Sequence, residues 1–485
     1  MEPIPKRPMR IALALVALEA VAALRASGLF QASHSSNAAP HSGLATSTPP
    51  IRRKRQEMLN YMDVQYFANI TVGGQQITGI IDTGSFELVV FESHCDGCGR
   101  AGAYDGKVSK AHSLGPLTRG LFYGSGDVYA QEAFDRVEIG PFRGVNQSYW
   151  EAYEANMPVL NQARFQSIIG VGPPEMPAVE AWKQTQKSVQ TVVGSIEKEG
   201  LPHSWQTDRV LSDLNFSVEI SHEPVMLNSY NISLFSLCLL ETPGSPGYFI
   251  WNDTSVLEHP SYFTTVRVLG RHTWAVGMTR VELVPRWPNV APAQLACTEG
   301  GCGAIVDSGT SLLMMPSQVV GKLQAALQKM GAVDCKNIED LPHLVFRLDG
   351  TIFSLPPDAY LTEAEEESVP EYMASFARVR RLMPESRDGC RISVMESYSG
   401  SDLGPLWILG MPFFRKYYTT FNVGSSRADR SLHIATASSE CLPEEPGSSL
   451  VRQGRREAFR RHLDLEHLYL PPIVRKATQG GFMEL

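Results

Sequence analysis

The sequence is poor in charge, and its few charges nearly balance. Of 485 residues only 19% are Asp, Glu, Lys or Arg, and 43 basic against 51 acidic residues give a net charge of −8. This balance offers no basic surface for nucleic-acid phosphates, so we expect no nucleic-acid partner. No apolar run reaches the roughly 18 residues of a membrane-spanning helix, which argues against a bundle of such helices. The composition leaves a slightly acidic chain of two or three domains, at roughly 100–200 residues each.

Several kinds of chemistry also lack their motifs. The 12 His residues show no metal-ligand spacing. Ser and His occur without a nucleophile elbow, and no glycine motif for phosphates or dinucleotides is present. We therefore expect no metal ion and no cofactor. What the chain does have is 43% hydrophobic residues, enough to fill sizeable cores.

The N-terminal end has the features of a secretory signal. Three basic residues within the first ten precede the apolar stretch Ile11–Leu24, which only Glu19 interrupts, and small residues follow. We predict a signal peptide over residues 1–26, with an uncleaved anchor or a cytosolic amphipathic start as alternatives. The chain would contact a membrane only if this segment stayed attached.

A polar stretch separates this signal from the rest of the chain. Residues 27–50 contain no Asp, Glu, Lys or Arg and have too little apolar material to bury. They run into the basic sequence Arg52-Arg53-Lys54-Arg55. We interpret residues 27–55 as a pro-segment that is removed at this basic run, leaving a mature chain from about Gln56. A solvated basic patch is the alternative.

The other end, residues 443–485, is also polar and of mixed charge. We interpret it as an extension of unknown role. Phe459, Leu463 and Leu470 fall on one side of a helix, so a weak helix is predicted over residues 457–470.

Two stretches of the chain read alike. Ile80-Ile81-Asp82-Thr83-Gly84-Ser85 is matched later by Ile305-Val306-Asp307-Ser308-Gly309-Thr310, and each is followed at long range by an apolar-apolar-Gly element. Short runs rich in β-branched and aromatic residues predict strands over 66–72, 134–139, 262–269, 274–284 and 417–423, and a helix over 317–330. We infer two related, largely β lobes, residues 56–252 and 253–442, each contributing one carboxylate.

Two such carboxylates can perform hydrolysis together. A lone Asp-Thr-Gly is weak evidence for a catalytic site, because an Asp side chain often hydrogen-bonds to its own backbone in an Asx turn. Two carboxyls within hydrogen-bond distance in a poorly solvated site cannot both ionise, so the pair supplies an acid and a base. Asp82 and Asp307 are therefore the candidate catalytic residues. Glycine lets backbone and substrate approach closely, and the Ser85 and Thr310 hydroxyls can hold the carboxylates.

With these motifs in view, the chain resembles the pepsin-family (A1-type) aspartic proteases from about Tyr66 to Ala437. Asp82-Thr83-Gly84-Ser85 and Asp307-Ser308-Gly309-Thr310 match the two catalytic loops, Tyr123-Gly124-Ser125-Gly126 matches the flap hairpin, and Trp407–Phe421 matches the last signature. The unusual insertions and flanks suggest a protist, apicomplexan-like branch.

The resemblance implies a mostly β, bilobal fold with an inter-lobe sheet and a central cleft, acting as a monomer on protein or peptide substrates. Asp82 and Asp307 would activate one water, and Tyr123 would close over the substrate. The resemblance implies supporting or substrate-binding roles for Thr83, Gly84, Ser85, Gly124, Ser125, Ser308, Gly309 and Thr310.

Three departures from the family pattern stand out. Val89 occupies a position that is usually the Trp supporting the flap tyrosine, so flap support must differ here. Met411 follows Gly410 where pepsin-like enzymes often carry Asp, which predicts a higher working pH. The short pro-segment has no Lys before Lys54, which puts the usual inhibition by a basic pro-segment in doubt.

Eight cysteines behind a signal peptide imply disulfides. Cys95-x2-Cys98 has a zinc knuckle or a redox motif as its alternatives. By position, the resemblance implies the bonds Cys95–Cys98, Cys297–Cys302 and Cys335–Cys390. This leaves Cys238 and Cys441, which we expect to pair through the inter-lobe sheet.

We conclude that the sequence predicts an aspartic endopeptidase of the secretory pathway, secreted or in an acidic vesicle, with Asn-x-Ser/Thr glycosylation sites. The rivals are a weakly active or inactive protease-like binding or inhibitor protein and an unrelated two-lobed adhesion protein. Residues 202–230 are read as an insertion in the first lobe. Residues 363–371 are read as an acidic surface loop, with substrate repulsion or partner binding as the alternative.

Overall fold

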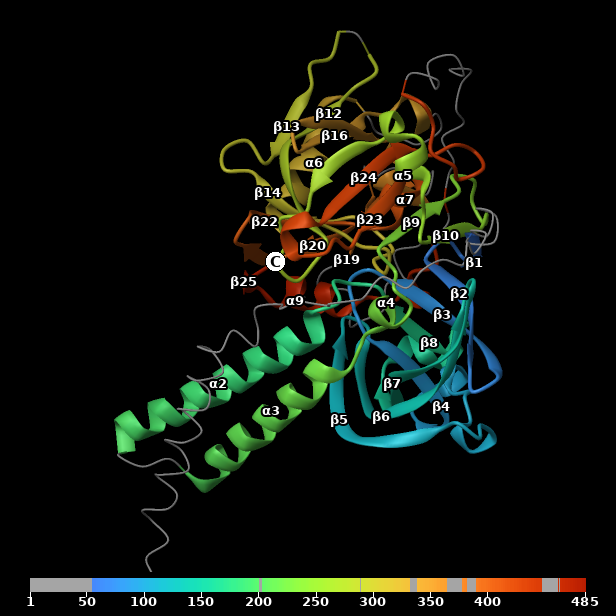
Figure 1. The fold of residues 1–485 in the computed structure, drawn as a ribbon. Coiled ribbons are helices and arrows are strands. Elements are labelled where there is room, and N and C mark those ends of the chain that lie inside the picture. Colours follow the sequence, from blue (N-terminus) through green and yellow to red (C-terminus); the bar gives the residue numbers. More distant parts are fainter. Residues whose placement is uncertain are drawn as a thin grey trace, which may run out of the picture. The chain divides into compact units, whose positions relative to one another are not determined.

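The computed structural model describes residues 55–199, 203–287, 289–331, 338–363, 377–381, 390–446, 461 and 463–485. It is mostly β, with two large sheets (Figure 1). The chain separates into two compact units. Residues 175–199 and 203–224 are the described part of one unit, and the second contains both β lobes and the C-terminal residues. The predicted mostly β, two-lobed fold is confirmed.

The first lobe is a sheet that folds back on itself. Its neighbour order is β2-β3-β8-β4-β7-β6-β5, and β2 also pairs with β6. The strands are β2 (Gln65–Val72), β3 (Gln75–Asp82), β4 (Leu88–Asp96), β5 (Ser113–Tyr123), β6 (Gly126–Ile139), β7 (Phe142–Asn156) and β8 (Ser167–Gly170).

The second lobe is built on a second sheet, in the order β17-β16-β12-β14-β22-β15-β20-β18. Its strands are β12 (Ala275–Val284), β13 (Ala293–Ala296), β14 (Cys302–Val306), β15 (Met314–Pro316), β16 (His343–Leu348), β17 (Thr351–Leu355), β18 (Leu361–Glu363), β19 (Ala377–Arg381), β20 (Cys390–Ser397), β21 (Ser399–Ser401) and β22 (Gly404–Leu409). The α-helices here are α6 (Ser317–Lys329) and α7 (Met411–Lys416). The helix predicted over 317–330 is therefore present.

Strands from both ends of the sequence form the connection between the lobes, in the order β11-β24-β23-β9-β10-β1. They are β1 (Arg55–Tyr61), β9 (Leu234–Leu239), β10 (Gly247–Trp251), β11 (Thr264–Arg267), β23 (Tyr417–Asn422) and β24 (Ser431–Thr436), with the short helices α4 (Met226–Ser229) and α5 (Ser255–Glu258) nearby in sequence. The strand predicted over 262–269 is shorter than expected, because Pro260–Tyr262 forms a 3₁₀ turn.

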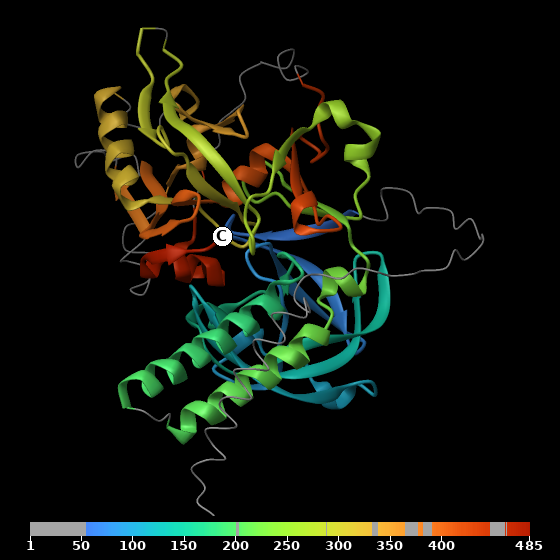
Figure 2. The same cartoon turned by 60° about the vertical axis from the view of Figure 1, so that its left-hand side comes forward.

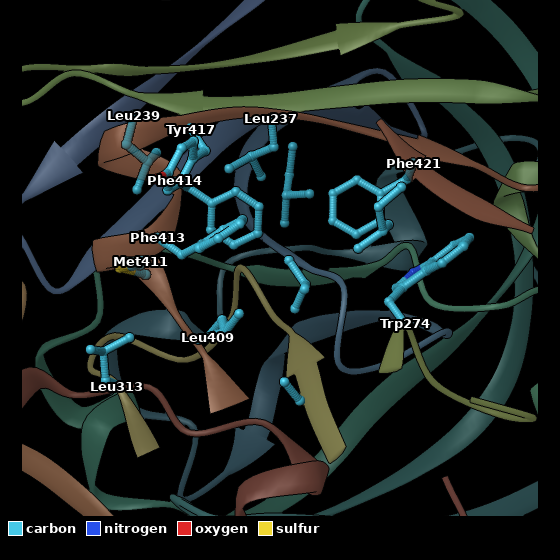
Figure 3. Packing of buried hydrophobic residues seen from close by; sticks show 14 of the residues in the cluster. Leu237, Leu239, Trp274, Leu313, Leu409, Met411, Phe413, Phe414, Tyr417 and Phe421 are labelled. Atoms are coloured by element: carbon cyan, nitrogen blue, oxygen red, sulfur yellow. The ribbon is translucent and has the colours of Figure 1, made fainter. Parts of the chain in front are cut away.

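Aromatic residues fill the core beneath this connection (Figure 3). The Phe235 ring stacks on Phe421 at 4.8 Å between centroids, and Trp274 meets Phe421 edge-on at 5.2 Å. All three side chains are fully buried. At about 150–250 Å² of surface each, such residues contribute strongly to the free energy of folding, so this core holds the connecting strands firmly together.

The inferred duplication appears as one arrangement present twice. In the first lobe β3 runs parallel to β8, with Asp82 opposite Gly170. In the second, β14 runs parallel to β22, with Val306 opposite Leu409. The Asp307 amide then donates to the Leu409 carbonyl at 3.0 Å. Each apolar strand thus delivers its Asp at the end of a buried parallel pair.

The other compact unit is a helical hairpin, which the sequence analysis did not predict. Helices α2 (Met176–Glu199) and α3 (Ser204–His222) pack through Val192 and Val210. The Ser188 hydroxyl donates to Asp213 Oδ2 at 2.5 Å, which ties the two helices together. The insertion read as residues 202–230 therefore consists of α3 and the start of the next segment, with α2 preceding it.

Residues 463–485 correct a further expectation. The predicted helix over 457–470 is wrong in its described part, since residues 463–470 contain only a 3₁₀ turn at Leu465–His467, with extended backbone at Asp464 and Leu468 on either side of it. Consecutive prolines at 471 and 472 then start helix α9 (Pro472–Gln479), because proline fits the first turn of a helix. Strand β25 (Gly481–Met483) ends the segment by pairing with β21.

Helix α9 contacts β5 of the first lobe and both β20 and β21 of the second. Two views show it in red where the two groups of strands meet (Figures 1 and 2). Within the described residues, no helix has the length and apolar character needed to cross a membrane.

Candidate active site

The two repeated aspartates meet between the lobes. Asp82 ends β3 and Asp307 follows β14, and the side chains of both are completely buried. The two carboxyls lie close enough for the charge of Asp82 to act on Asp307. The structure therefore brings together the pair that the sequence analysis singled out.

The glycine two positions after each Asp allows the two carboxyls to lie close together. A Cβ atom on Gly84 would lie 2.8 Å from Asp307 Oδ1, and one on Gly309 would lie 2.4 Å from Asp82 Oδ1. Real Cβ atoms do not approach oxygen so closely, so any side chain at either position would push the opposite carboxyl away. Each lobe thus leaves room for the other lobe's acid.

Hydrogen bonds hold both carboxyls in the same way. The Gly84 amide donates to Asp82 Oδ1 at 2.8 Å, and the Ser85 hydroxyl donates to Asp82 Oδ2 at 2.6 Å. Around Asp307, the Gly309 amide donates to Oδ1 at 3.0 Å and the Thr310 hydroxyl donates to Oδ2. These bonds fix the plane of each carboxyl without supplying a positive charge.

The middle residues of the two motifs tie the lobes together. The Thr83 amide donates to Ser308 Oγ at 3.1 Å, and the Ser308 amide donates to Thr83 Oγ1 at 2.9 Å. Each hydroxyl then donates to a carbonyl of the opposite strand, Thr83 to Val306 and Ser308 to Ile81. All four bonds are buried, so the position of each Asp depends on the other lobe.

Burial governs the acidity of the pair. It raises the pKa of Asp307 well above its ordinary value, and the neighbouring Asp82 charge raises it further. Burial also raises the pKa of Asp82, although hydrogen bonds from Ser85 and Tyr469 oppose the rise. One proton shared by the pair is the state that this environment favours.

The predicted flap is the hairpin between β5 and β6, in which Tyr123 pairs with Gly126. Gly126 has a φ of +144°, and a Cβ there would lie 2.2 Å from the Asn156 carbonyl, so this turn requires glycine. Tyr123 and Ser125 are both buried. The predicted residues Tyr123, Gly124 and Ser125 therefore lie together at the hairpin tip.

Sequence reasoning missed a residue that touches the pair. The Tyr469 hydroxyl donates to Asp82 Oδ2 at 2.8 Å, and its ring lies 6.0 Å from the Tyr123 ring. The ring thus packs beside the flap tyrosine, in a protein whose Val89 replaces the usual Trp. The available signal was the spacing of Leu463, Leu465, Leu468 and Leu470 ahead of two prolines, which suits an extended buried segment.

Three disulfides are present among the described residues: Cys95–Cys98, Cys297–Cys302 and Cys238–Cys441. Their Cα atoms are 5.5, 5.4 and 5.7 Å apart, within the usual range. Cys95 and Cys98 are thus bonded to each other, which leaves neither sulfur free as a thiolate ligand for zinc. The expected Cys335–Cys390 bond lies outside the described residues, since Cys335 and the Cys390 side chain are not described. In the described part of the chain, no group of His, Cys, Asp or Glu is placed to hold a metal ion.

Comparison with known proteins agrees with this geometry. Residues 65–201 and 225–431 match the family model of the eukaryotic aspartyl proteases. Gastricsin of Homo sapiens is 28% identical over 388 residues, covering 76% of this chain and 82% of gastricsin. Pepsin A of Bos taurus is 26% identical over 382 residues (77% and 85%), and cathepsin E-B of Xenopus laevis is 23% identical over 387 residues (77% and 80%). The chain therefore belongs to the eukaryotic aspartyl protease family.

Proposed function

We propose that this protein is an aspartic endopeptidase that hydrolyses peptide bonds with a water activated by Asp82 and Asp307. The observation that carries the proposal is the pair of completely buried carboxyls that meet between the lobes, each held by the glycine amide and the hydroxyl of its own motif. Family membership supports a peptidase acting on proteins or peptides.

The mechanism follows from one shared proton. The ionised carboxyl accepts a proton from water as that water attacks the peptide carbonyl carbon. The protonated carboxyl donates its proton to the carbonyl oxygen, so the tetrahedral intermediate forms without free ions. Return of a proton to the leaving nitrogen completes hydrolysis. The Gly84 and Gly309 amides and the Ser85 and Thr310 hydroxyls keep both acids in place throughout.

The pH dependence has a definite sign. The pair must keep one proton, and burial raises the pKa of Asp307 well above its ordinary value. Activity should persist above pH 4. It should fall at higher pH, where the pair loses the one proton that it shares. Met411, buried and bonded through its amide to the Thr310 carbonyl, places a thioether beside this loop instead of an acid. This agrees with a less acidic optimum than a third carboxyl would give.

The N-terminal signal features and the disulfides support a place in the secretory pathway, where disulfides persist. The rival proposal, a protease-like binding protein without activity, would retain the cleft but would not need a protonated pair.

The test is cleavage of a denatured protein between pH 3 and 7 and its inhibition by pepstatin. Both the uncut chain and chain cut once between residues 447 and 460 are assayed, because residues 463–485 lie against the carboxyl pair. Asp82→Asn and Asp307→Asn should each lower kcat by at least about a thousandfold, and the exposed Asp96→Asn should leave it unchanged. Pepstatin-insensitive cleavage, or equal rates in the Asn variants, would contradict the proposal.

A further inference from the structure

Residues 463–485, which we call the cleft segment, run directly over the carboxyl pair. Tyr469 and Leu470 are completely buried, and the Tyr469 hydroxyl donates a hydrogen bond to Asp82 Oδ2 at 2.8 Å. Ser85 donates to the same oxygen. A water activated by the pair needs access to these carboxyl oxygens, so the phenol occupies a position that the attacking water requires.

The flap binds the backbone of the cleft segment. The Gly124 amide donates to the Leu470 carbonyl at 2.9 Å, and the Leu470 amide donates to Ser125 Oγ at 2.7 Å. The Ser125 hydroxyl reaches the Leu468 carbonyl at 3.3 Å. Backbone bonds to an extended chain are the sequence-independent way in which proteases and other peptide-binding proteins hold a peptide. The flap residues that were predicted to contact substrate are therefore already engaged.

Close packing leaves no room for a second peptide here. A Cβ on Gly124 would lie 2.8 Å from the Leu470 Cβ, and a Cβ on Gly309 would lie 3.3 Å from the Pro471 Cγ. The Phe165 ring meets Tyr469 at 6.1 Å between centroids. A substrate could reach Asp82 and Asp307 only after the cleft segment had left.

The segment is anchored on both sides of Tyr469. Arg475 of α9 forms an ion pair with Asp127 behind the flap and lies over the Phe122 ring. At the far end, Arg271 pairs with Glu484 at 2.7 Å, and β25 adds to β21. These partners belong to both lobes, so the segment bonds to the flap region and bridges the two lobes.

Most of the segment's apolar residues are buried in a cluster shared with the second lobe. The members from the segment are Leu463, Leu465, Leu468, Leu470, Ile473, Val474, Ala477 and Leu485. A loosely attached surface tail would not bury so many side chains. The segment therefore has an apolar surface that is complementary to the second lobe.

We propose that the cleft segment is an intramolecular inhibitor that blocks the carboxyl pair with Tyr469 and holds the flap closed. The inference concerns regulation of the site proposed above and rests on that proposed function. The segment does not present a peptide carbonyl to the pair through any described hydrogen bond, and a phenol cannot be hydrolysed. The segment therefore binds along the flap as a peptide substrate would. At the carboxyl pair, however, it places the phenol of Tyr469 and not a peptide bond that could be cleaved.

The test cuts the folded protein, which avoids asking a truncated chain to fold. A recognition sequence for a specific protease is placed within residues 447–460, and the cut segment is separated under mild conditions. The matched control carries the same recognition sequence between Glu199 and His203, where a cut leaves the segment attached. Binding of fluorescent pepstatin and cleavage of a quenched peptide are both measured, because binding does not depend on catalysis.

We expect pepstatin affinity and kcat/KM to rise at least tenfold only after the cut within 447–460, and a synthetic peptide of residues 461–485 to reverse both. Binding that rises without any cleavage would support the inhibitor and overturn the proposed endopeptidase. Equal pepstatin binding before and after removal of the cleft segment, or no binding in either state, would overturn the proposal that the segment is an inhibitor.

A second variant tests the phenol itself. Tyr469→Phe removes only the hydroxyl bonded to Asp82, and hydrogen bonds to charged groups are worth about a tenfold change or more in an equilibrium. The uncut variant should therefore bind pepstatin about tenfold more tightly. Tyr153→Phe, at a half-exposed position of the first lobe, is the control and should have no effect. An unchanged affinity in Tyr469→Phe would show that the phenol does not block the pair.

Discussion

At the scale of single residues, the carboxyl pair couples the stability of the fold to pH. Burial makes the folded protein hold a proton on Asp307 more tightly than the unfolded chain does. The contribution of this group to stability is therefore complete below its ordinary pKa of 3.8 and is lost as the pH rises through the folded value.

Replacing this acid should stabilise the protein at neutral pH. In Asp307→Asn the group no longer titrates, so the variant does not lose this stability as the pH rises. At neutral pH its free energy of unfolding should exceed that of the natural chain by about 1.4 kcal/mol for every tenfold weakening of the acid on folding. The gain should shrink towards zero below pH 3.8. Thermal unfolding at several pH values measures it, with exposed Asp96→Asn as the control. A pH-independent difference would contradict this explanation.

The positions of Gly84 and Gly309 have no room for a side chain. Gly84→Ala would place a methyl group 2.8 Å from Asp307 Oδ1. Overpacking of this kind costs about 1–3 kcal/mol, and the displaced carboxyl should remove nearly all activity. Gly321→Ala is the matched control, because Gly321 is exposed in helix α6 with open space around its Cβ position. That variant should instead gain about 0.5–1 kcal/mol. Equal effects at both positions in denaturant unfolding would disprove the steric argument.

At the scale of elements, an ion cluster fixes the chain just before the cleft segment. Arg461 is 1% exposed and lies 3.2 Å from Asp63 and 3.6 Å from Asp358. Burial lowers the pKa of Arg461 and raises that of Asp358, while Arg415, Asn60 and Arg461 overcome burial and lower the pKa of Asp63. The cluster therefore depends on all its charges being present.

Removing Arg461 should loosen the cleft segment. Arg461→Met leaves the buried Asp63 and the partly buried Asp358 with one cation fewer, and breaking a buried pair costs about 3–5 kcal/mol. Amide exchange of residues 463–470 should accelerate by about a hundredfold or more, measured by hydrogen–deuterium exchange. Met in place of the exposed Arg427 is the control. Unchanged exchange in Arg461→Met would mean that the ion cluster does not anchor the segment.

The same elements show what the sequence could predict. The strands that carry Asp82 and Asp307 were found because apolar residues, Asp and Gly occur twice in one order, and local chemistry decides that pattern. Helix α6 was found because Val320, Leu323 and Leu327 recur at helical spacing and pack as expected.

Other elements depend on contacts that local patterns do not contain. Residues 463–470 carry leucines at intervals that suit a helix or an extended chain, and contacts with the flap decide for the extended form. Helix α2 contains Thr185, Val189, Val192 and Gly194, whose low helix propensities hid it. The role of Tyr469 also depends on a contact 387 positions away along the chain.

At the scale of the whole molecule, the two lobes should unfold together. Strand β1 near the start of the described chain pairs with β10, and β23 and β24 near the end pair beside β9 in the same sheet. The bonds between Thr83 and Ser308 add a second connection beside the carboxyl pair.

The cooperative unfolding of the lobes can be measured. Calorimetry of the uncut chain should give one main transition for both lobes, and Thr83→Val should lower the transition temperature without splitting it. Thr265→Val, which removes a hydroxyl from the exposed end of the sheet, is the control. Two separate transitions for the lobes would contradict this expectation.

The disulfide Cys238–Cys441 determines which fragments stay covalently joined after the chain is cut. It closes a loop across 203 positions, so a single cut anywhere between its two cysteines leaves two pieces that separate on a gel only after reduction. None of the eight cysteines lies after residue 441. A cut between residues 441 and 463 therefore frees the cleft segment from every covalent link, whether or not a reducing agent is present. Cuts within this loop therefore leave the pieces covalently joined, whereas after a single cut between residues 441 and 463 dilution can remove Tyr469 permanently.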